Sequence, residues 1–175
     1  MKNTATHYGW VAKALHWTIA LLVLMMIFMG YFFWHFQDKT FQAQVHNFHK
    51  SVGLLIFALM VIRFIWMLCN KKPAYPASMP RWQQIAAKTN AWCFYITLLL
   101  MPIFGWLIAF SAGFPPKFFG LFTVGEKIAK NKPLLEFAKD MHSTLAIIIC
   151  ILIGLHLLAI IHHTRRKDSI LKRMC

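Results

Sequence analysis

The sequence contains little charge, and it contains especially little negative charge. Asp and Glu together account for 5 of its 175 residues, and charged residues of both signs make up 14%. A soluble domain of this length needs a far more polar surface. Hydrophobic residues instead make up 59% of the chain, and several apolar runs reach the roughly 20 residues needed to cross a bilayer. The composition therefore predicts an integral membrane protein.

Paired cysteines are missing as well. The four cysteines, Cys69, Cys93, Cys150 and Cys175, stand apart from one another, and the chain has no C-x-x-C pair. This excludes covalent attachment of a c-type haem, which needs C-x-x-C-H, and it argues against a zinc or iron–sulfur site.

Long polar segments are also absent, which excludes a separate soluble module. The formal net charge of +14 would suggest nucleic-acid binding in a soluble protein, but no polar stretch is long enough to fold into such a domain. Most Lys and Arg lie near the ends of apolar runs, where they meet anionic lipid head groups. Residues 1–10 lack a small-residue cleavage site, so we interpret the first apolar run as a retained helix.

The apolar residues form four runs separated by short connections. The predicted helices cover approximately residues 14–34, 49–69, 91–111 and 142–163. Pro102 and Gly105 fall inside the third, where neighbouring helices can satisfy the freed backbone groups. We predict an all-α fold, an integral membrane four-helix bundle that forms a single domain over residues 1–175.

Lys and Arg are distributed unequally between the two sides of this predicted bundle. Both termini, and the connection between the second and third helices, lie on one side. That side has twelve basic residues: Lys2, Lys13, Arg63, Lys71, Lys72, Arg81, Lys88, Arg165, Arg166, Lys167, Lys172 and Arg173. The other side has seven: Lys39, Lys50, Lys117, Lys127, Lys130, Lys132 and Lys139. Because basic loops stay inside, we predict that both termini are cytoplasmic.

Four histidines lie near the ends of the predicted helices, namely His16, His49, His142 and His156. Ionisable residues within a bilayer are costly and are functional candidates. A neutral imidazole is a good axial ligand for haem iron. For a single histidine at a helix end, a hydrogen bond between packed helices is the commoner alternative.

The depth of these histidines in the membrane suggests how they pair. His142 and His156 are 14 residues apart, which is almost four turns and about 21 Å, so they share one face of the fourth helix. His49 begins the second helix near the outer face, and His16 lies near the inner face. The spacing therefore pairs His49 with His142 outside and His16 with His156 inside, as the ligands of two stacked haems.

Other polar residues lie close to the predicted inner pair. Arg63 follows His49 by 14 residues, so it either binds a haem propionate or extends to the lipid head groups. His163 follows His156 by seven residues on the same face. His163, His162 and Lys13 are candidates for a quinone site or its proton supply, and a plain interfacial role is the alternative. His46, one turn before His49, competes with it as a ligand.

Several motifs support a family resemblance. They are Tyr8-Gly9-Trp10 ahead of Leu15-His16-Trp17, His49-Lys50-Ser51-Val52-Gly53 with Arg63 after it, Pro102-Ile103-Phe104-Gly105, Met141-His142-Ser143-Thr144-Leu145, Gly154-Leu155-His156 and the pair His162-His163. With these motifs the chain resembles the bacterial cytochrome b561 family, particularly its superoxide oxidase-like members, over nearly its whole length.

The resemblance implies two non-covalent haem b groups, ligated by His16, His49, His142 and His156, and it favours His49 over His46. It also implies a multi-pass protein of the bacterial inner membrane. Family members differ in activity: some oxidise superoxide and pass the electron to ubiquinone, and others are cytochrome subunits of hydrogenases or dehydrogenases.

Our leading hypothesis is therefore a superoxide:ubiquinone oxidoreductase-like enzyme. Superoxide, or another small donor, would deliver electrons at the periplasmic face, and ubiquinone would be reduced near the cytoplasmic face. The lysine-rich connection 112–141 could steer an anion, or it could simply contact lipid phosphate. The alternative is a haem b subunit that passes electrons between a partner dehydrogenase or hydrogenase and the quinone pool. A haem-free anchor or transporter is a third hypothesis.

Overall fold

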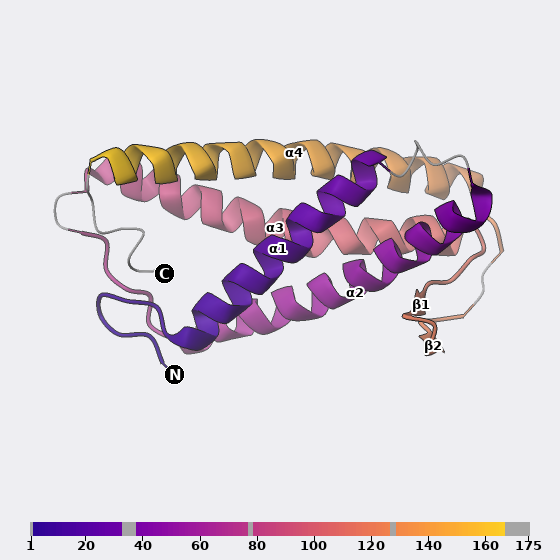
Figure 1. The fold of residues 1–175 in the computed structure, drawn as a ribbon, viewed down its shortest axis with the longest axis horizontal. Coiled ribbons are helices and arrows are strands. Elements are labelled where there is room, and N and C mark those ends of the chain that lie inside the picture. The colour runs from indigo at the N-terminus through magenta and orange to yellow at the C-terminus, as the bar shows by residue number, and fades with distance from the viewer. Residues whose placement is uncertain (1, 33–37, 77–78, 127–128, 167–175) are drawn as a thin grey trace.

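The computed structural model describes residues 2–32, 38–76, 79–126 and 129–166. Its elements are α1 (Trp10–Phe32), α2 (Lys39–Cys69), α3 (Arg81–Ser111), β1 (Lys117–Phe118), β2 (Phe122–Thr123) and α4 (Lys132–Arg165). Within these ranges, four helices are long and apolar enough to cross a membrane. The predicted all-α membrane four-helix bundle is confirmed, with α4 beside α3 and with α1 packed against α2 and inclined to it (Figure 1).

The helices are longer than the predicted ranges. The starts predicted at residues 49, 91 and 142 are wrong by ten residues, because α2, α3 and α4 begin at Lys39, Arg81 and Lys132. The predictions followed the apolar windows, whereas each helix extends beyond its apolar part, and α2 and α4 begin at residues that cap them. Asp38 accepts hydrogen bonds from the backbone N–H groups of Thr40 and Phe41.

Smaller differences occur at the remaining helix ends. Asn131 caps α4 by accepting a hydrogen bond from the backbone N–H of Leu134. Helix α1 begins at Trp10 rather than residue 14, and α4 ends at Arg165 rather than residue 163. The predicted end of the first helix, Trp34, lies outside the described residues.

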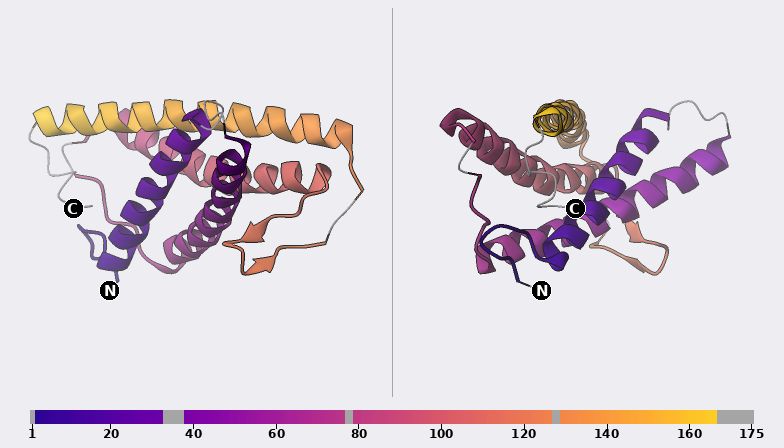
Figure 2. Two further views of the ribbon diagram at one scale, coloured as in Figure 1. Left: turned by 45° about the vertical axis from the view of Figure 1, so that its right-hand side comes forward. Right: turned by 60° about the vertical axis from the view of Figure 1, so that its left-hand side comes forward.

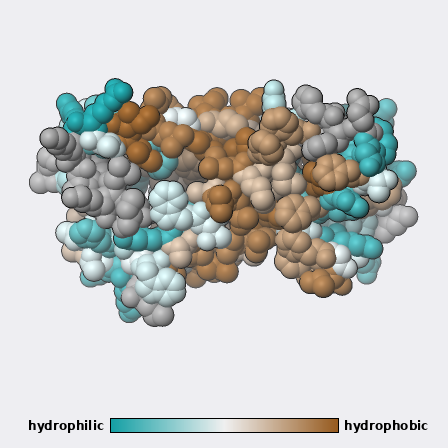
Figure 3. All heavy atoms as spheres, in the orientation of Figure 1, coloured by the Kyte–Doolittle hydropathy of each residue, from teal (hydrophilic) through white to brown (hydrophobic). Residues whose placement is uncertain are grey.

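An apolar core fills the middle of the bundle. Its buried members come from all four helices: Ile19, Val23, Val52, Ile56, Met60, Leu98 and Ile149. Most of the remaining apolar side chains face outward, and in space-filling view they form a brown belt between two polar ends (Figure 3). Such a belt matches the hydrocarbon layer of a bilayer, so these helices contact membrane lipid.

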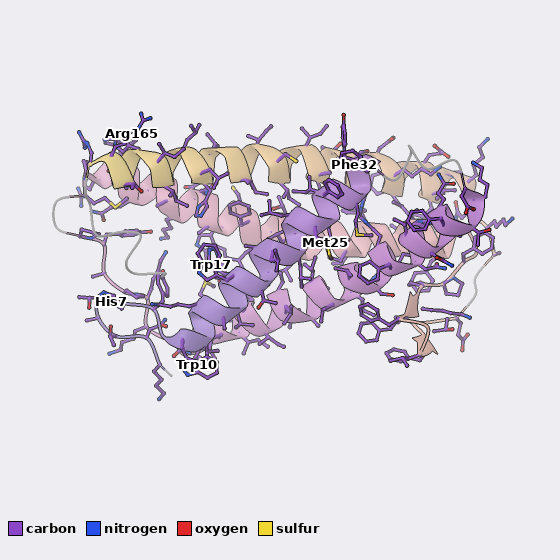
Figure 4. The ribbon with its side chains drawn as sticks, in the orientation of Figure 1. His7, Trp10, Trp17, Met25, Phe32 and Arg165 are labelled. Carbon is purple, nitrogen blue, oxygen red and sulfur yellow. The ribbon has the colours of Figure 1, made fainter. Side chains whose placement is uncertain are left out.

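The two ends of the bundle differ. At one end lie Trp10, at the start of α1, and Arg165, at the end of α4 (Figure 4); we call it the terminal end. At the opposite end lies a small hairpin, in which β1 pairs antiparallel with β2 (Figure 2); we call it the hairpin end. Lys127, Lys167, Lys172 and Arg173, which contributed to the predicted orientation, lie outside the described residues.

A buried serine fastens the hairpin to α2. The Ser51 hydroxyl accepts a hydrogen bond from the backbone N–H of Phe119 at 2.9 Å and lies 2.9 Å from the carbonyl oxygen of Lys117. The turn between the strands needs a left-handed backbone, with φ of 46° at Phe119 and 78° at Gly120. The connection after α3 is therefore folded back against the start of the membrane-spanning part of α2.

Candidate functional site

The four predicted histidines form two pairs. The ring centres of His49 and His142 are 6.3 Å apart at the hairpin end, and those of His16 and His156 are also 6.3 Å apart towards the terminal end. His16 lies beside Trp17 on α1, which Figure 4 shows in the half of the helix nearer the terminal end. The structure thus brings together the same histidines that the depth argument paired from the sequence.

The separation of the rings fits a metal between them. A first-row metal lies about 2 Å from an imidazole nitrogen, and that nitrogen lies about 1 Å from the ring centre, so two rings on opposite sides of one iron have centres about 6 Å apart. The planes of the rings are inclined at 60° and 68°. Both pairs have the spacing that two axial ligands of one haem require.

The two members of each pair stand on helices whose backbones are not packed closely against each other. Among the described residues, α4 packs closely along α3, and it makes no extended backbone contact with α1 or α2, which carry its partner histidines. The apolar core lies between the levels of the two pairs, because Ile149 is seven residues from both His142 and His156. The two histidine pairs therefore lie at separate levels along the bundle, with the apolar core between them.

The orientation of His142 suits metal binding. Its Nδ1 atom lies 3.2 Å from the carbonyl oxygen of Met101. A carbonyl only accepts hydrogen bonds, so Nδ1 holds the proton in this contact and Nε2 keeps the lone pair that a metal needs. The same contact is a hydrogen bond between packed helices, which was the alternative role considered for a single histidine. The geometry of His142 is therefore compatible with both roles.

Gly105 makes this contact possible. A Cβ atom at this position would lie 3.3 Å from Cε1 and 3.5 Å from Nδ1 of His142. Contacts that short force a neighbour to move, so the missing side chain lets the ring reach the α3 backbone. Sequence reasoning noted Gly105 only as part of a motif and did not find this role.

Arg63 lies beside the His16–His156 pair, as its spacing from His49 predicted. Its Nη1 atom lies 3.1 Å from Nδ1 of His16. A guanidinium only donates hydrogen bonds, so here Nδ1 of His16 accepts and its proton lies on Nε2. Metal binding through Nε2 requires the opposite tautomer, with the proton on Nδ1. Arg63 must therefore move away from Nδ1 before His16 can bind iron through Nε2.

Two buried indole donors were missed by the sequence analysis. Within the described part of the chain, Nε1 of Trp66 and Nε1 of Trp106 are buried and have no hydrogen-bond partner. Trp66 is one turn beyond Arg63 towards the terminal end, and Trp106 directly follows Gly105 towards the hairpin end. Unpaired donors in a membrane are costly. Nothing in the spacing of tryptophans in the sequence distinguishes these two from the rest.

Of the other predicted residues, three lie at the terminal end and His46 lies at the hairpin end. His163 is buried in the last turn of α4, and His162 beside it is exposed. Their ring centres are 5.3 Å apart. Lys13 is half-buried in the first turns of α1. His46 lies one turn before His49 on α2.

Comparison with known proteins finds relatives along nearly the whole chain. A model of the family described as prokaryotic cytochrome b561 matches residues 7–175. The chain is 31% identical to cytochrome b561 homolog 2 of Escherichia coli strain K12, over 98% of this chain and 93% of that protein. It is 28% identical to cytochrome b561 homolog 1 of the same organism, over 91% and 92%.

A further relative is named for an activity. The chain is 30% identical to the probable superoxide oxidase CybB of Yersinia pestis, over 95% of this chain and 94% of that protein. The family model covers nearly all of the sequence, and these relatives match it from end to end. The chain therefore belongs to the prokaryotic cytochrome b561 family, and it is a haem b electron-transfer protein of the bacterial membrane.

Proposed function

We propose that this chain carries electrons across the bacterial inner membrane, from superoxide at the hairpin end to ubiquinone near the terminal end. The observation that carries this proposal is the presence of two histidine pairs with the same 6.3 Å ring separation at two depths. We assign two haem b groups, one held by His49 and His142 and the other by His16 and His156. Bound haem supplies one-electron carriers that protein side chains cannot provide.

Polar side chains around each pair can hold the carboxylates of a haem. Once Arg63 leaves Nδ1 of His16, its guanidinium is free to pair with a propionate. The unpartnered indole N–H groups of Trp66 and Trp106 are donors that a propionate can satisfy, one towards each end of the bundle. These three donors, on Arg63, Trp66 and Trp106, support one haem at each histidine pair.

The hairpin end suits a small anionic donor. Exposed Lys117 in β1, and Lys130 and Lys132 beyond the hairpin, place positive charge around this end. A positive surface raises the encounter rate of an anion. Each superoxide loses one electron and leaves as O₂, so no side chain has to donate or accept a proton there.

The acceptor reaction needs protons as well as electrons. One ubiquinone takes two electrons, from two superoxide anions, and two protons to become ubiquinol. We propose that His163, His162 and Lys13 pass these protons from the cytoplasm, with both termini on that side. Replacing His163 and His162 together with Phe should slow quinone reduction, and an unchanged rate would remove these residues from the proposal.

The decisive experiment is a visible spectrum of the purified protein with haem counted per chain, before and after a pulse of superoxide. We expect two haems that are reduced within the mixing time and reoxidised by ubiquinone. Replacing His142 with Ala should lower the count to about one. Two haems that ignore superoxide would instead favour a subunit that serves a partner dehydrogenase or hydrogenase.

A further inference from the structure

A basic hollow lies at the start of α3, at the terminal end of the bundle. Its volume is about 390 Å³, and it is lined by Tyr75, Arg81, Gln84, Ile85 and Lys88. Arg81 and Lys88 are seven residues apart on α3, which is two turns and about 10 Å, so they lie on one face of the helix. Between them, Gln84 is held by a hydrogen bond from its Nε2 to the carbonyl oxygen of Met79 at 2.8 Å. The hollow thus has a polar wall with one cation at each end.

The positive charge of this hollow is not neutralised by its surroundings. Arg81 and Lys88 are exposed, and neither forms an ion pair with a residue that the structure describes. The described acidic residues all lie at the opposite, hairpin end. Lys72 adds a third cation beside the wall, with its Nζ 5.4 Å from the ring centre of Tyr75. The hollow therefore attracts an anion, and a guanidinium pairs especially well with the oxygens of a phosphate.

An apolar groove adjoins the hollow and continues between α3 and α4. Its volume is about 430 Å³, and its walls include Trp82, Ile85 and Ala86 from α3 and Leu152 and Leu155 from α4. Ile85 lines both spaces, so the hollow and the groove meet at this residue. Leu152 and Leu155 belong to the apolar part of α4, which lies at the depth of the hydrocarbon layer. Trp82 is 67% exposed, and tryptophans gather at the level of the head groups. The hollow therefore lies among head groups and the groove among acyl chains.

We propose that the hollow and the groove together bind one anionic phospholipid, with its phosphate between Arg81 and Lys88 and an acyl chain along the groove. Phosphatidylglycerol and cardiolipin have this chemistry, and basic pockets between membrane helices bind such head groups. A zwitterionic lipid would bring an ammonium group towards two unpaired cations, which disfavours it. A free phosphate would fill the hollow alone and leave the groove unused. This inference does not depend on the electron donor or acceptor of the proposed function.

The test is native mass spectrometry of the full chain with its haems, purified in detergent and titrated with phosphatidylglycerol or with phosphatidylcholine of the same acyl chains. Arg81→Gln combined with Lys88→Gln removes the two charges of the hollow. Its control, Lys2→Gln combined with Lys71→Gln, removes two exposed charges from the same end but outside the hollow. Inorganic phosphate is added in a separate titration as a competitor.

A second pair of variants tests the groove. Ala86→Phe fills the groove from its α3 wall, and its control, Ile96→Phe, adds similar bulk at an exposed position of α3 outside the groove. We expect the wild type and both controls to bind phosphatidylglycerol at least tenfold more tightly than phosphatidylcholine. The double Gln variant of the hollow should lose this preference, and Ala86→Phe should weaken phosphatidylglycerol binding at least tenfold. All variants should keep the haem content of the wild type.

The same measurements can overturn the proposal. An equal lipid preference in the double Gln variant of the hollow and in its control would show that Arg81 and Lys88 do not hold the head group. Unchanged phosphatidylglycerol binding in Ala86→Phe would show that no acyl chain occupies the groove. Displacement of phosphatidylglycerol by an equal concentration of inorganic phosphate would assign the hollow to free phosphate instead of a lipid.

Discussion

At the scale of single residues, neighbouring groups determine which ring nitrogen holds the proton in His142 and in His16. The Met101 carbonyl accepts a hydrogen bond from Nδ1 of His142, so the proton of His142 lies on Nδ1. Arg63 instead donates a hydrogen bond to Nδ1 of His16, so the proton of His16 lies on Nε2. In the proposed haem sites, the first contact would leave Nε2 of His142 ready to bind iron, and the second would have to break before Nε2 of His16 could bind it. The pairing of the histidines could be predicted from depth, but these contacts could not, because they depend on helix rotation and on which carbonyls a neighbour can reach.

Replacing Gly105 with Ala should weaken haem binding at the hairpin end. The new Cβ would crowd His142 at 3.3 Å and push its ring off the Met101 carbonyl, although Ala itself favours a helix by about 1 kcal/mol over Gly. We expect the haem count of purified protein to fall from two towards one, with the haem of His16 and His156 retained.

Gly53→Ala provides the matched control for that change. Its Cβ would meet only Cε of Met26, at an ordinary 3.8 Å, so two haems should remain. A full haem count and an unchanged spectrum in Gly105→Ala would show that the close approach of His142 to α3 has no part in ligation.

Replacing Arg63 with Gln should lower the reduction potential of one haem. A positive charge about 10 Å from iron disfavours the more positive ferric form by roughly 2 kcal/mol at an effective dielectric constant of 20, so its removal should lower the potential by several tens of millivolts. A redox titration followed in the visible spectrum resolves the two haems. Arg63→Lys should keep most of the wild-type value, and an equal shift of both haems would contradict the assignment of Arg63 to the His16–His156 pair.

At the scale of elements, the apolar runs predicted how many helices form but not where they begin. Hydropathy marks the part of a helix that lies in lipid, and the helix itself continues until a residue such as Asp38 or Asn131 satisfies its first N–H groups. Both caps are visible in the sequence, where a search for capping residues ahead of each run could have found them. The hairpin β1–β2 had no such signal, because strands of two residues show no alternation.

Replacing Ser51 with Ala should release the hairpin from α2. The change leaves the N–H of Phe119 and the carbonyl of Lys117 without their partner, which costs about 1–3 kcal/mol. We expect trypsin to cleave after Lys117 on the order of ten times faster in intact protein. Ser143→Ala is the control, since that exposed hydroxyl bonds only within its own helix, and equal cleavage in both variants would show that Ser51 does not hold the hairpin.

At the scale of the whole molecule, the charges of the two ends are unequal. Among the described residues, nine Lys and Arg lie at the terminal end and six at the hairpin end, while the described acidic residues, Asp38, Glu126, Glu136 and Asp140, all lie at the hairpin end. The positive-inside rule counts Lys and Arg near the ends of spans, and it therefore predicts that the terminal end is cytoplasmic. The same count leaves only a small positive excess to attract superoxide at the hairpin end.

This orientation is tested by labelling single cysteines in a chain whose four native cysteines are replaced with Ala. Lys117→Cys lies at the hairpin end and Lys71→Cys at the terminal end, and both positions are exposed. In intact cells with a permeable outer membrane, a membrane-impermeant maleimide should label position 117 and spare position 71, and inverted membrane vesicles should give the reverse. Because the proposed electron donor and acceptor are assigned to opposite ends, labelling of position 71 from outside the cell would reverse the proposed direction of electron flow together with the orientation.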